Sequence, residues 1–484
     1  MTVLQSSGEV VLADGQAASE LLYSTLSDAV DELRLPRGSW NLSDQAAFRR
    51  DYALRLPLYE AARLASPQRS ALAQLMVQGL NQKVHWQHGA SSLPLAHALR
   101  SSKPRIGLDA PRSAAALPLE VHHFKSPLAC QPSLVYSGRQ WTGDEWVALG
   151  EKMLEQQVIS TAAAESLAWV SRELLHSGSL DLRARKIVVL GAGAEMAPTR
   201  LWLEAGAQVL WLDTLPPPES WQRDERLAGS LFWPAQGVDL LQRPQEVLAT
   251  MIAFADGDPL DVGLYAYAPG RAREVRLTGA MNALVDALPV ELLASVTLLV
   301  SPTTPTALSA HEVSAMQARL DRRPGWERWL AAVGVLGRTV GPAEIASGAA
   351  TRTVVSIQGA SYQAAQYLGK ILTAEVWAAR KAFRVSANTA AITRTRSLEH
   401  PIFTAAFGGA AAFGIETLTP TQSRYLNGVL ALADWLQPGA PMPGKVRVHG
   451  GIHTLPYPLE SALRVAAAIG FVRKPGLLLG LVKK

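Results

Sequence analysis

From residue 186 onward, continuous apolar runs alternate with stretches of helical periodicity, and this alternation restricts the fold more than any other feature of the 484-residue chain. The apolar runs are KIVVLGAG, AQVLWLDT, SLFWPAQGVDL, LDVGLYAYAPG and ASVTLLVSPTTP. Runs that are apolar throughout, and not only at every second residue, indicate strands buried on both faces. Such strands separated by helices indicate βαβ units with right-handed crossovers. The pattern therefore predicts an α/β fold built on a doubly wound parallel sheet.

The remainder of the chain predicts additions to this sheet. Residues 1–140 form a mainly helical region, because apolar residues recur every three or four positions in DQAAFRRDYALRLPLYEAARLA and RSALAQLMVQGLNQKVHWQ. We expect the sheet domain to span residues 141–400, with an insertion at about 306–350. Residues 401–484 then form a C-terminal helical segment that helps to cover the site.

Composition and charge exclude several classes of protein. Hydrophobic residues make up 48% of the chain and charged residues 18%, which is typical of a globular protein and not of a disordered one. The net charge of +5, with no long Lys/Arg run, does not favour a nucleic-acid partner. Cys130 is the only cysteine, which excludes an intrachain disulfide and a cysteine-based metal site. We see neither a signal peptide nor an uninterrupted apolar window of about 18 residues, so we expect a cytoplasmic protein without a transmembrane span.

The C-terminal stretch LRVAAAIGFVRKPGLLLGLVKK comes nearest to a membrane segment, but Arg473, Lys474 and Pro475 interrupt it. We expect a buried terminal helix followed by a packed tail. Peripheral contact of the basic end with an anionic membrane surface stays open as the alternative. The sequence also leaves a homo-oligomer open.

The first apolar run enters a glycine-rich turn, VVLGAGAEMAPTRLWLEAGAQVLWLDT. Gly191 permits a tight turn at the end of the strand, and Gly193 lets a dinucleotide diphosphate approach the backbone at the start of the next helix. Asp213 follows Gly191 by 22 residues, at the end of the second run, where a carboxylate can accept hydrogen bonds from ribose hydroxyls. Because this charge repels a 2′-phosphate, NAD(H) is favoured, with NADP(H) as the alternative.

The same turn departs from the usual dinucleotide pattern. Met196 takes the third glycine position, with Ala197 beside it, and Glu195 adds a negative charge near the expected phosphates. Ala194 completes the predicted cofactor contacts of the turn. A methyltransferase also combines a glycine-rich turn with an acid after the second strand, but it normally carries another acid two residues before the first glycine, where this chain has Val189. We therefore rank S-adenosylmethionine as a cofactor below a nicotinamide dinucleotide.

The segments that follow resemble those of a known family. GVDLLQRPQEVLATMIAFADGDPLDVGLYAYAPG resembles the third to fourth strands of the short-chain dehydrogenase/reductase superfamily, and SVTLLVSPTTP resembles its fifth strand. KAFRVSANTAAITRTRS resembles the sixth strand and the loop after it. The resemblance covers residues of about 186–400. It implies a Rossmann-type fold that binds NAD(P) and transfers a hydride between the nicotinamide ring and a small-molecule carbonyl or alcohol.

This resemblance also implies roles for individual residues. The implied cofactor contacts beyond the glycine turn are Asp239, Leu240, Ala268, Pro269 and Gly270. The first two follow the third strand, near the adenine, and the last three form the turn beside the nicotinamide ribose. Ser301, at the end of the fifth strand, is the nearest match to the serine that orients the substrate carbonyl, and Thr303 offers an alternative hydroxyl for the substrate.

A tyrosine and a lysine complete the site that the family uses, and VVSIQGASYQAAQYLGKILTAEVW supplies Tyr362, Tyr367 and Lys370. In the family the tyrosine exchanges a proton with the substrate oxygen, and the lysine lowers the tyrosine pKa from its usual value near 10. The usual spacing is four residues, which places both on one helix face. Four residues after Tyr362 stands Gln366, and Lys370 follows four later. Both tyrosines therefore remain catalytic candidates, and ordinary packing of both is the alternative.

Two further groups of polar residues lie near the predicted site. Arg394 and Arg396 follow the sixth strand and could bind a carboxylate or phosphate of the substrate. VHGGIH carries His449 and His453 four residues apart, a spacing that binds metal when it lies on a helix. The two intervening glycines favour a loop that lines the active site, so we predict no metal site.

Taken together, the sequence predicts an NAD(P)-dependent oxidoreductase. Gln366 and Met196 support the alternative of a catalytically altered Rossmann-fold protein that binds a ligand or serves as a scaffold. A transferase that uses S-adenosylmethionine in the same crevice is the third interpretation.

Overall fold

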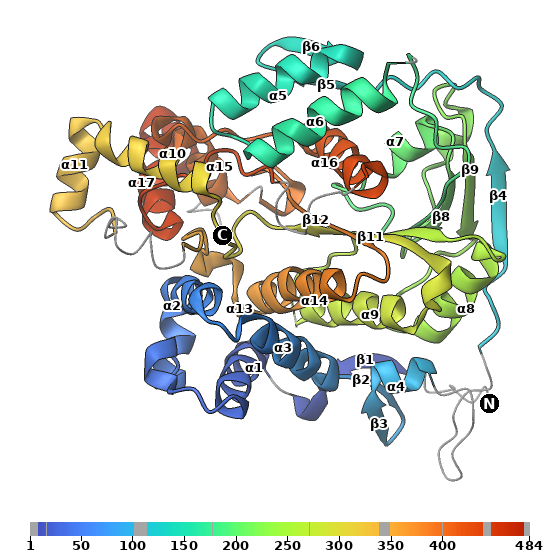
Figure 1. Cartoon of the computed structure of the whole chain (residues 1–484), viewed down its shortest axis with the longest axis horizontal. Helices are drawn as coiled ribbons and strands as arrows, with labels where there is room; N and C mark the ends of the chain where they lie inside the picture. Colours follow the sequence, from blue (N-terminus) through green and yellow to red (C-terminus); the bar gives the residue numbers. More distant parts are fainter. Residues whose placement is uncertain are drawn as a thin grey trace.

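A seven-stranded sheet forms the centre of the protein (Figure 1). The structure, a computed structural model, describes residues 8–15, 17–100, 114–176, 178–270, 272–337, 349–398, 400–438 and 447–478. The strands that the sequence predicted in this sheet are β7 (Lys186–Leu190), β8 (Gln208–Leu212), β9 (Ser230–Pro234), β10 (Leu260–Leu264), β11 (Leu293–Val300) and β12 (Arg384–Thr389).

The order of the strands is β12-β11-β10-β7-β8-β9-β4, and the first six are parallel. Numbered along the chain, these six lie in the order 6-5-4-1-2-3, which is the doubly wound order of Rossmann-type sheets. The predicted α/β class with a mostly parallel sheet is therefore confirmed. The direction of winding reverses between β7 and β10, and ligands of such sheets bind at the carboxyl ends of the strands at this switch point.

Burial on both faces explains why the strands are apolar throughout. In β7, Val188 and Leu190 belong to a core shared with the N-terminal helices. Ile187 and Val189 belong to a second core on the opposite face. All four side chains are fully buried. Alternate residues of one strand thus supply two separate cores, as the continuous apolar run predicted.

Helices cover both faces of the sheet (Figure 1). On one face lie α5 (Trp146–Glu155), α6 (Thr161–Leu174), α7 (Thr199–Glu204) and α16 (Pro420–Leu436). On the other lie α8 (Pro244–Ala255), α9 (Arg273–Ala287), α13 (Ala360–Gln363), a π-helical segment (Ala364–Leu372) and α14 (Thr373–Arg380). The last three form one continuous helical stretch, which is the segment expected to carry the catalytic tyrosine.

The N-terminal region forms a further layer beneath α9 and α14 (Figure 1). It contains β1 (Glu9–Leu12), α1 (Ala18–Glu32), α2 (Gln45–Ala65), α3 (Arg69–Lys83), β2 (Val84–His88), β3 (Ser91–Pro94) and α4 (Leu95–Arg100). The first three strands pair as a small sheet in the order β1-β2-β3. Later in the same region, β4 (Leu119–His123) pairs antiparallel with β9 and becomes the edge strand of the main sheet. A hairpin of β5 (Ser133–Tyr136) and β6 (Arg139–Thr142) precedes α5.

The insertion and the C-terminal segment lie side by side at one end of the molecule (Figure 1). The described helices there are α10 (Ala310–Asp321), α11 (Gly325–Ala332), α15 (Pro401–Ala410) and α17 (Leu459–Arg473). Residues from α11, α15 and α17 pack into a shared core or against it. Within the described part of the chain, no helix is both long enough and apolar enough to cross a membrane. The last residues of the C-terminal tail, 479–484, lie outside the described residues.

Candidate functional site

The glycine-rich turn after β7 lies at the switch point of the sheet. Gly191 has a φ of +84°, a backbone conformation that glycine adopts without steric cost. A Cβ at this position would lie 2.3 Å from the Cα of Ala266, which follows β10. The Gly191 amide donates to the carbonyl of Leu212 at 2.7 Å. Glycine is therefore required here because the chain turns between three neighbouring strand ends.

Asp213 holds this turn in place from the end of β8. Its Oδ2 accepts a hydrogen bond from the Gly193 amide at 2.9 Å, and its Oδ1 accepts one from the Thr214 amide at 2.6 Å. Gly193 itself is exposed. The carboxylate and an exposed backbone segment thus meet at the predicted nucleotide position, where ribose hydroxyls could donate to the same carboxylate.

The helix after the turn begins later than the sequence predicted. We expected Gly193 at a helix N-terminus, but α7 starts only at Thr199 and contains six residues. The intervening residues form turns; Ala194, Glu195 and Met196 are partly exposed and Ala197 is buried. Pro198 at the N-cap explains the late start, because the residue before a proline is disfavoured in the helical conformation. The expected helix N-terminus next to Gly193 was therefore wrong, whereas the approach of a diphosphate to the Gly193 backbone stays a prediction.

Glu195 joins the glycine turn to the loop after β12. Its Oε2 accepts a hydrogen bond from the Arg396 amide at 3.1 Å, and its Oε1 lies 3.9 Å from the Arg396 guanidinium. The Arg396 side chain is 81% exposed, so this ion pair is weak and the guanidinium is free to move. Arg394 points elsewhere, because its Nε donates to the hydroxyl of Thr417 at 2.9 Å.

The predicted contacts after β9 and β10 form two local turns. Asp239 accepts a hydrogen bond from the Leu241 amide at 2.8 Å, and Leu240 is buried. After β10, Ala268 is partly exposed and Pro269 and Gly270 are exposed.

Glu274 connects the second of these turns to the helix that carries Tyr362. It accepts hydrogen bonds from the Gly270 amide at 3.1 Å and from the Ser361 hydroxyl at 2.8 Å. As a result, the ring of Tyr267 packs edge-on against the ring of Tyr362, with centroids 6.2 Å apart.

Ser301 and Tyr362 meet at the carboxyl end of β11. Burial raises the pKa of Tyr362, and the neighbouring Ser301 side chain acts on it in the opposite direction. The Ser301 hydroxyl also shares a hydrogen bond with the Thr303 hydroxyl at 2.7 Å, and Thr303 donates to Oε1 of Gln358 at 2.7 Å. Tyr362 remains partly exposed. Two hydroxyls and a carboxamide thus form one hydrogen-bonded chain beside the phenol of Tyr362.

Gln366 and Lys370 follow Tyr362 at intervals of four residues, and both contact the end of β11. Gln366 accepts a hydrogen bond from the Ser301 amide at 2.9 Å through its Oε1. Lys370 donates to the carbonyl of Leu299 at 2.7 Å, and burial lowers its pKa to about 8. Its ammonium group therefore lies below Ser301, at the level of the strand, and not at the strand tip.

Tyr367 projects in a different direction, toward the N-terminal region. Its hydroxyl donates to Oε2 of Glu60 at 2.5 Å, and Glu60 in turn pairs with Arg63 at 2.7 Å. Tyr367, Glu60 and Arg63 are all 1% exposed or less. The structure thus brings Tyr362 to Ser301 and places Tyr367 in the interface between α2 and the π-helical segment.

Sequence reasoning missed the glutamines that hold the loop after β11. Besides Gln366 and Gln358, Gln363 donates to the carbonyl of Thr303 at 3.2 Å. The available signal was the placement of Gln363, Gln366 and Lys370 in a helical stretch that is otherwise almost entirely apolar. Polar residues at such spacing indicate a buried partner, although they do not identify it.

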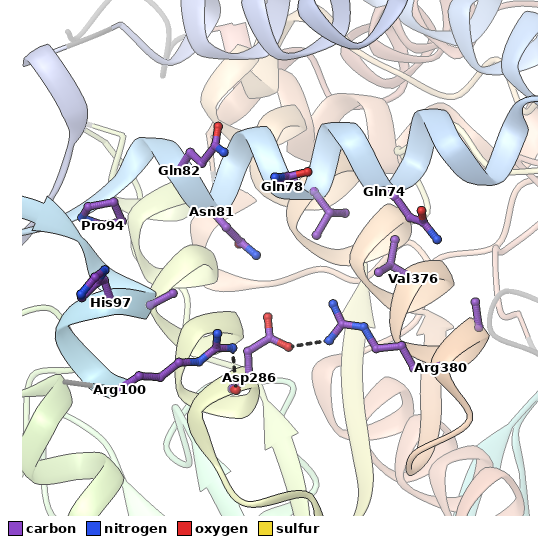
Figure 2. A pocket seen from close by; sticks show the side chains of 13 residues that line it. Gln74, Gln78, Asn81, Gln82, Pro94, His97, Arg100, Asp286, Val376 and Arg380 are labelled. Atoms are coloured by element: carbon purple, nitrogen blue, oxygen red, sulfur yellow. Dashed lines mark hydrogen bonds and ion pairs between the residues drawn. The ribbon is translucent and has the colours of Figure 1, made fainter. Parts of the chain in front are cut away.

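A separate groove of about 790 Å³ lies between α3, α4 and α14 (Figure 2). Gln74, Gln78 and Asn81 line one wall of it, and Arg380 donates to Asp286 at 3.0 Å on the other. Asp286 lies near the end of α9, which precedes β11, so the groove is at the amino ends of the strands. None of the predicted site residues lines it.

Comparisons with known proteins identify no family. No family model matches the chain, and no curated protein matches it. Among solved structures, it is similar to the 3-alpha-hydroxysteroid dehydrogenase from Pseudomonas sp. B-0831 complexed with NADH, at 16% sequence identity and a TM-score of 0.31. The match covers 55% of this chain and 96% of that chain. Because a likeness this low carries no functional weight, the proposal below depends on the geometry of this chain.

Proposed function

We propose that the protein is an oxidoreductase that uses NAD(H) to reduce a small-molecule carbonyl to an alcohol. The observation that carries this proposal is the position of the Tyr362 phenol next to the Ser301 side chain at the carboxyl end of β11. It brings a proton donor and a carbonyl-orienting hydroxyl together beside the switch point of a doubly wound sheet, where nucleotides bind.

The nucleotide half of the proposed site lies at the ends of β7 and β8. Asp213 would accept hydrogen bonds from the ribose hydroxyls, and the exposed backbone at Gly193 would face the diphosphate. The charge of Asp213 favours NAD(H) over NADP(H). Asp239 and Leu240 would border the adenine, and Ala268, Pro269 and Gly270 the nicotinamide ribose.

The remaining steps of the proposed mechanism belong to the residues at β11. A nicotinamide cofactor, when bound, would supply the hydride for the carbonyl carbon of the substrate. Ser301 would turn its hydroxyl proton from Thr303 to the carbonyl oxygen and orient it. Tyr362 transfers its proton to this oxygen as the hydride arrives, which yields the alcohol. Thr303 and Gln358 hold the Ser301 hydroxyl in position. Tyr362 is protonated at neutral pH, as an ordinary phenol is, so it has the proton that reduction of a carbonyl requires.

Lys370 has a supporting role in this proposal. Its hydrogen bond to Leu299 keeps it below the tip of the strand, so it stabilises the end of β11. We assign Tyr367 to the interface with α2 and leave it out of the catalytic set. Arg396 faces the glycine turn and would contact the diphosphate rather than the substrate.

Titration of the full chain with NADH tests the first half of the proposal. We expect enhanced cofactor fluorescence and a higher melting temperature, with a weaker response to NADPH. Asp213→Asn should reduce the preference for NADH, whereas Asp256→Asn is a matched control, because that residue caps the end of α8 away from the site. No response to either nucleotide at millimolar concentration would refute the proposal. Tighter binding of S-adenosylmethionine than of NADH would favour group transfer instead.

One observation favours a second candidate, a nucleotide-binding protein without turnover. The carboxamide of Gln366 is bonded to the Ser301 amide at the position where the family carries its lysine. A panel of carbonyl substrates with NADH distinguishes the two candidates, because only the enzyme oxidises NADH. Binding of NADH without oxidation by any member of an aldehyde and ketone panel would favour the second candidate.

A further inference from the structure

Exposed apolar side chains gather on α11 and the turn after it, at one end of the long axis of the molecule (Figure 1). Trp329 is 64% exposed, Val333 53%, Val335 51% and Trp326 37%. Ala332 is exposed as well. We call these five residues the α11 patch. Single exposed apolar residues are common on protein surfaces, whereas a group of neighbouring ones marks an interaction surface.

The spacing of the residues shows that α11 presents an apolar side to solvent. Trp326, Trp329 and Val333 stand at intervals of three and four, so they lie along one side of the helix. The other side faces the body of the protein, where Leu330 and Ala331 pack against the core shared with α15 and α17. A helix that is apolar all round is normally buried all round. In α11 only one side is buried, which leaves the α11 patch in need of a partner.

Two contacts hold the α11 patch in position. Glu327 is buried beneath the helix and accepts a hydrogen bond from the Tyr457 hydroxyl at 2.9 Å. The ring of Trp326 packs edge-on against the ring of Phe413, with centroids 5.3 Å apart. Because the helix is already fixed to the body, a partner can bind the α11 patch without the cost of ordering its backbone.

Positive charge lies beside the α11 patch. Arg322 and Arg328 are exposed, and neither forms an ion pair with a carboxylate of the described residues. Nε of Arg328 donates to the carbonyl of Arg323 at 3.0 Å, which does not neutralise the guanidinium. Asp321 is the exposed acid of this stretch, since Glu327 is buried. The exposed surface around the α11 patch therefore carries a net positive charge.

We propose that the α11 patch docks the protein on the surface of an anionic lipid bilayer. Tryptophan is enriched at the level of lipid headgroups, where its ring contacts the acyl chains and its N–H stays near water. Arginines next to it attract anionic headgroups. Because α11 lies at the outer end of the molecule, it can enter the headgroup region while the sheet stays outside (Figure 1). This inference goes beyond the proposed function and does not depend on it.

A second copy of the chain fits the α11 patch less well than a bilayer does. In a twofold dimer both copies use the same surface, so Arg322 and Arg328 of one copy would lie near those of the other. Like charges brought together across an interface oppose association. The same two charges favour an anionic bilayer, and this difference selects lipid as the partner.

Co-sedimentation of the full chain with vesicles tests the proposal. With three parts phosphatidylcholine to one part phosphatidylserine, we expect binding at low ionic strength that weakens as salt rises, and weak binding to phosphatidylcholine alone. Trp329→Gln should lower the partition coefficient by about tenfold. Val290→Gln is the matched control, because this valine is 52% exposed at the amino end of β11 and should leave binding unchanged.

The charge contribution is measured with the double variant Arg322→Gln/Arg328→Gln. We expect binding at low ionic strength to fall by about 10- to 30-fold, because each arginine near an anionic surface contributes on the order of 1 kcal/mol. Arg172→Gln, at an exposed position of α6, is the control for loss of one charge and should change binding little.

Quenching by lipids brominated in the acyl chain shows whether Trp329 itself enters the bilayer. We expect quenching of the wild-type tryptophan emission, and less quenching in Trp329→Phe, which keeps an apolar ring and so keeps most of the binding. A wild-type chain that stays in solution beside anionic vesicles at low ionic strength would overturn the proposal. Undiminished binding by Trp329→Gln with an unchanged melting temperature would also overturn it, since another surface would then bind. A wild-type dimer that Trp329→Gln dissociates would assign the α11 patch to a second copy instead.

Discussion

The two halves of the carboxyl edge of the sheet are built in different ways. At β7 and β8, Asp213 bonds to Gly193, and the contacts connect residues close in sequence at an exposed turn. At β11, Ser301 bonds to Gln366, and the contacts join distant segments and are buried. The first half is preformed by local turns, whereas the second exists only when the chain is fully packed.

The half at β11 also contains buried polar atoms that make no hydrogen bond within the described part of the chain. Among the described residues, the hydroxyls of Thr304 and Thr306 and Oε1 of Gln363 have no hydrogen-bond partner. Buried groups of this kind are uncommon in folded proteins and often mark sites that bind polar ligands. Under the proposed function, the exposed half would recognise the nucleotide and the buried half would bind the polar substrate.

Replacing Tyr362 and Tyr367 by phenylalanine, one at a time, is expected to give the largest effects, on turnover and on stability respectively. Tyr362→Phe removes the proposed proton donor, so we expect the turnover of a carbonyl substrate to fall by about 10²- to 10⁴-fold with NADH binding retained. Tyr367→Phe should leave turnover intact and lower the free energy of unfolding by about 1–3 kcal/mol, because buried Glu60 loses a hydrogen-bond donor. Steady-state kinetics and denaturant unfolding of both variants measure the two effects. The reverse pattern would show that the catalytic assignment is wrong.

The pH dependence of stability tests how deeply Lys370 is buried. Its pKa of about 8 in the folded protein lies below the unfolded value of 10.5, because burial disfavours the charged form. Both states hold the proton below pH 8, where the folded protein bears the full cost of the buried charge. Between pH 8 and 10.5 the unfolded state binds more protons, so stability rises with pH.

Lys370→Met removes this dependence. We expect the wild type to gain roughly 3 kcal/mol in the free energy of unfolding relative to the variant as pH rises from about 8 to 10.5. Urea unfolding at several pH values measures the difference, and Lys152→Met, at a partly exposed position of α5, is the control. A constant difference across this range would show that the ammonium is solvated or paired and is not held beneath Ser301.

The sequence predicted the sheet well because strands buried on both faces leave a local signature. Five apolar runs and the RVSAN segment correspond to β7 through β12, and Asp213 lies at the strand end that its spacing from Gly191 indicated. The late start of α7 was less predictable, because Pro198 overrides the usual geometry of the turn. A structural element can be predicted from the sequence where a few adjacent residues determine it.

The buried half of the site could be predicted only in part. The order of the strands placed Ser301 and the helix of Tyr362 near each other, but spacing alone left Tyr362 and Tyr367 equivalent. Their difference depends on Glu60, which belongs to α2 and lies 307 residues from Tyr367. The partner of Gln366 was equally unpredictable, since only tertiary packing brings the Ser301 amide to it. Contacts of this kind have no signature in a single sequence.

Lysine at position 366, where the resembled family carries one, tests the role of Gln366 in the buried half of the site. Gln366→Lys puts a cation where Oε1 accepts the Ser301 amide, so that amide loses its partner. We expect a loss of about 1–3 kcal/mol in the free energy of unfolding and no gain in turnover. Gln366→Glu, which keeps an acceptor, should lose less stability at acidic pH, where it is protonated. Thermal unfolding and kinetics measure both variants, and a more active Gln366→Lys would contradict the assigned role of Gln366.

Removal of one charge in the exposed half is expected to give the smallest effect, a change in the affinity for NADH. Glu195→Gln removes a negative charge beside the proposed diphosphate position and releases the Arg396 guanidinium, which is 81% exposed and held only by a 3.9 Å ion pair. We expect NADH to bind about two- to fivefold more tightly, because exposed ion pairs contribute little and a freed cation can turn to the diphosphate.

This gain should shrink as ionic strength rises, since salt screens exposed charges. Fluorescence titration with NADH at low and high salt measures both effects. Glu291→Gln, an exposed change at the amino end of β11, should leave the affinity unchanged. If the affinity of Glu195→Gln for NADH fell instead, Glu195 would be holding the glycine turn open through the Arg396 amide, and the exposed half would depend on a distant contact just as the buried half does.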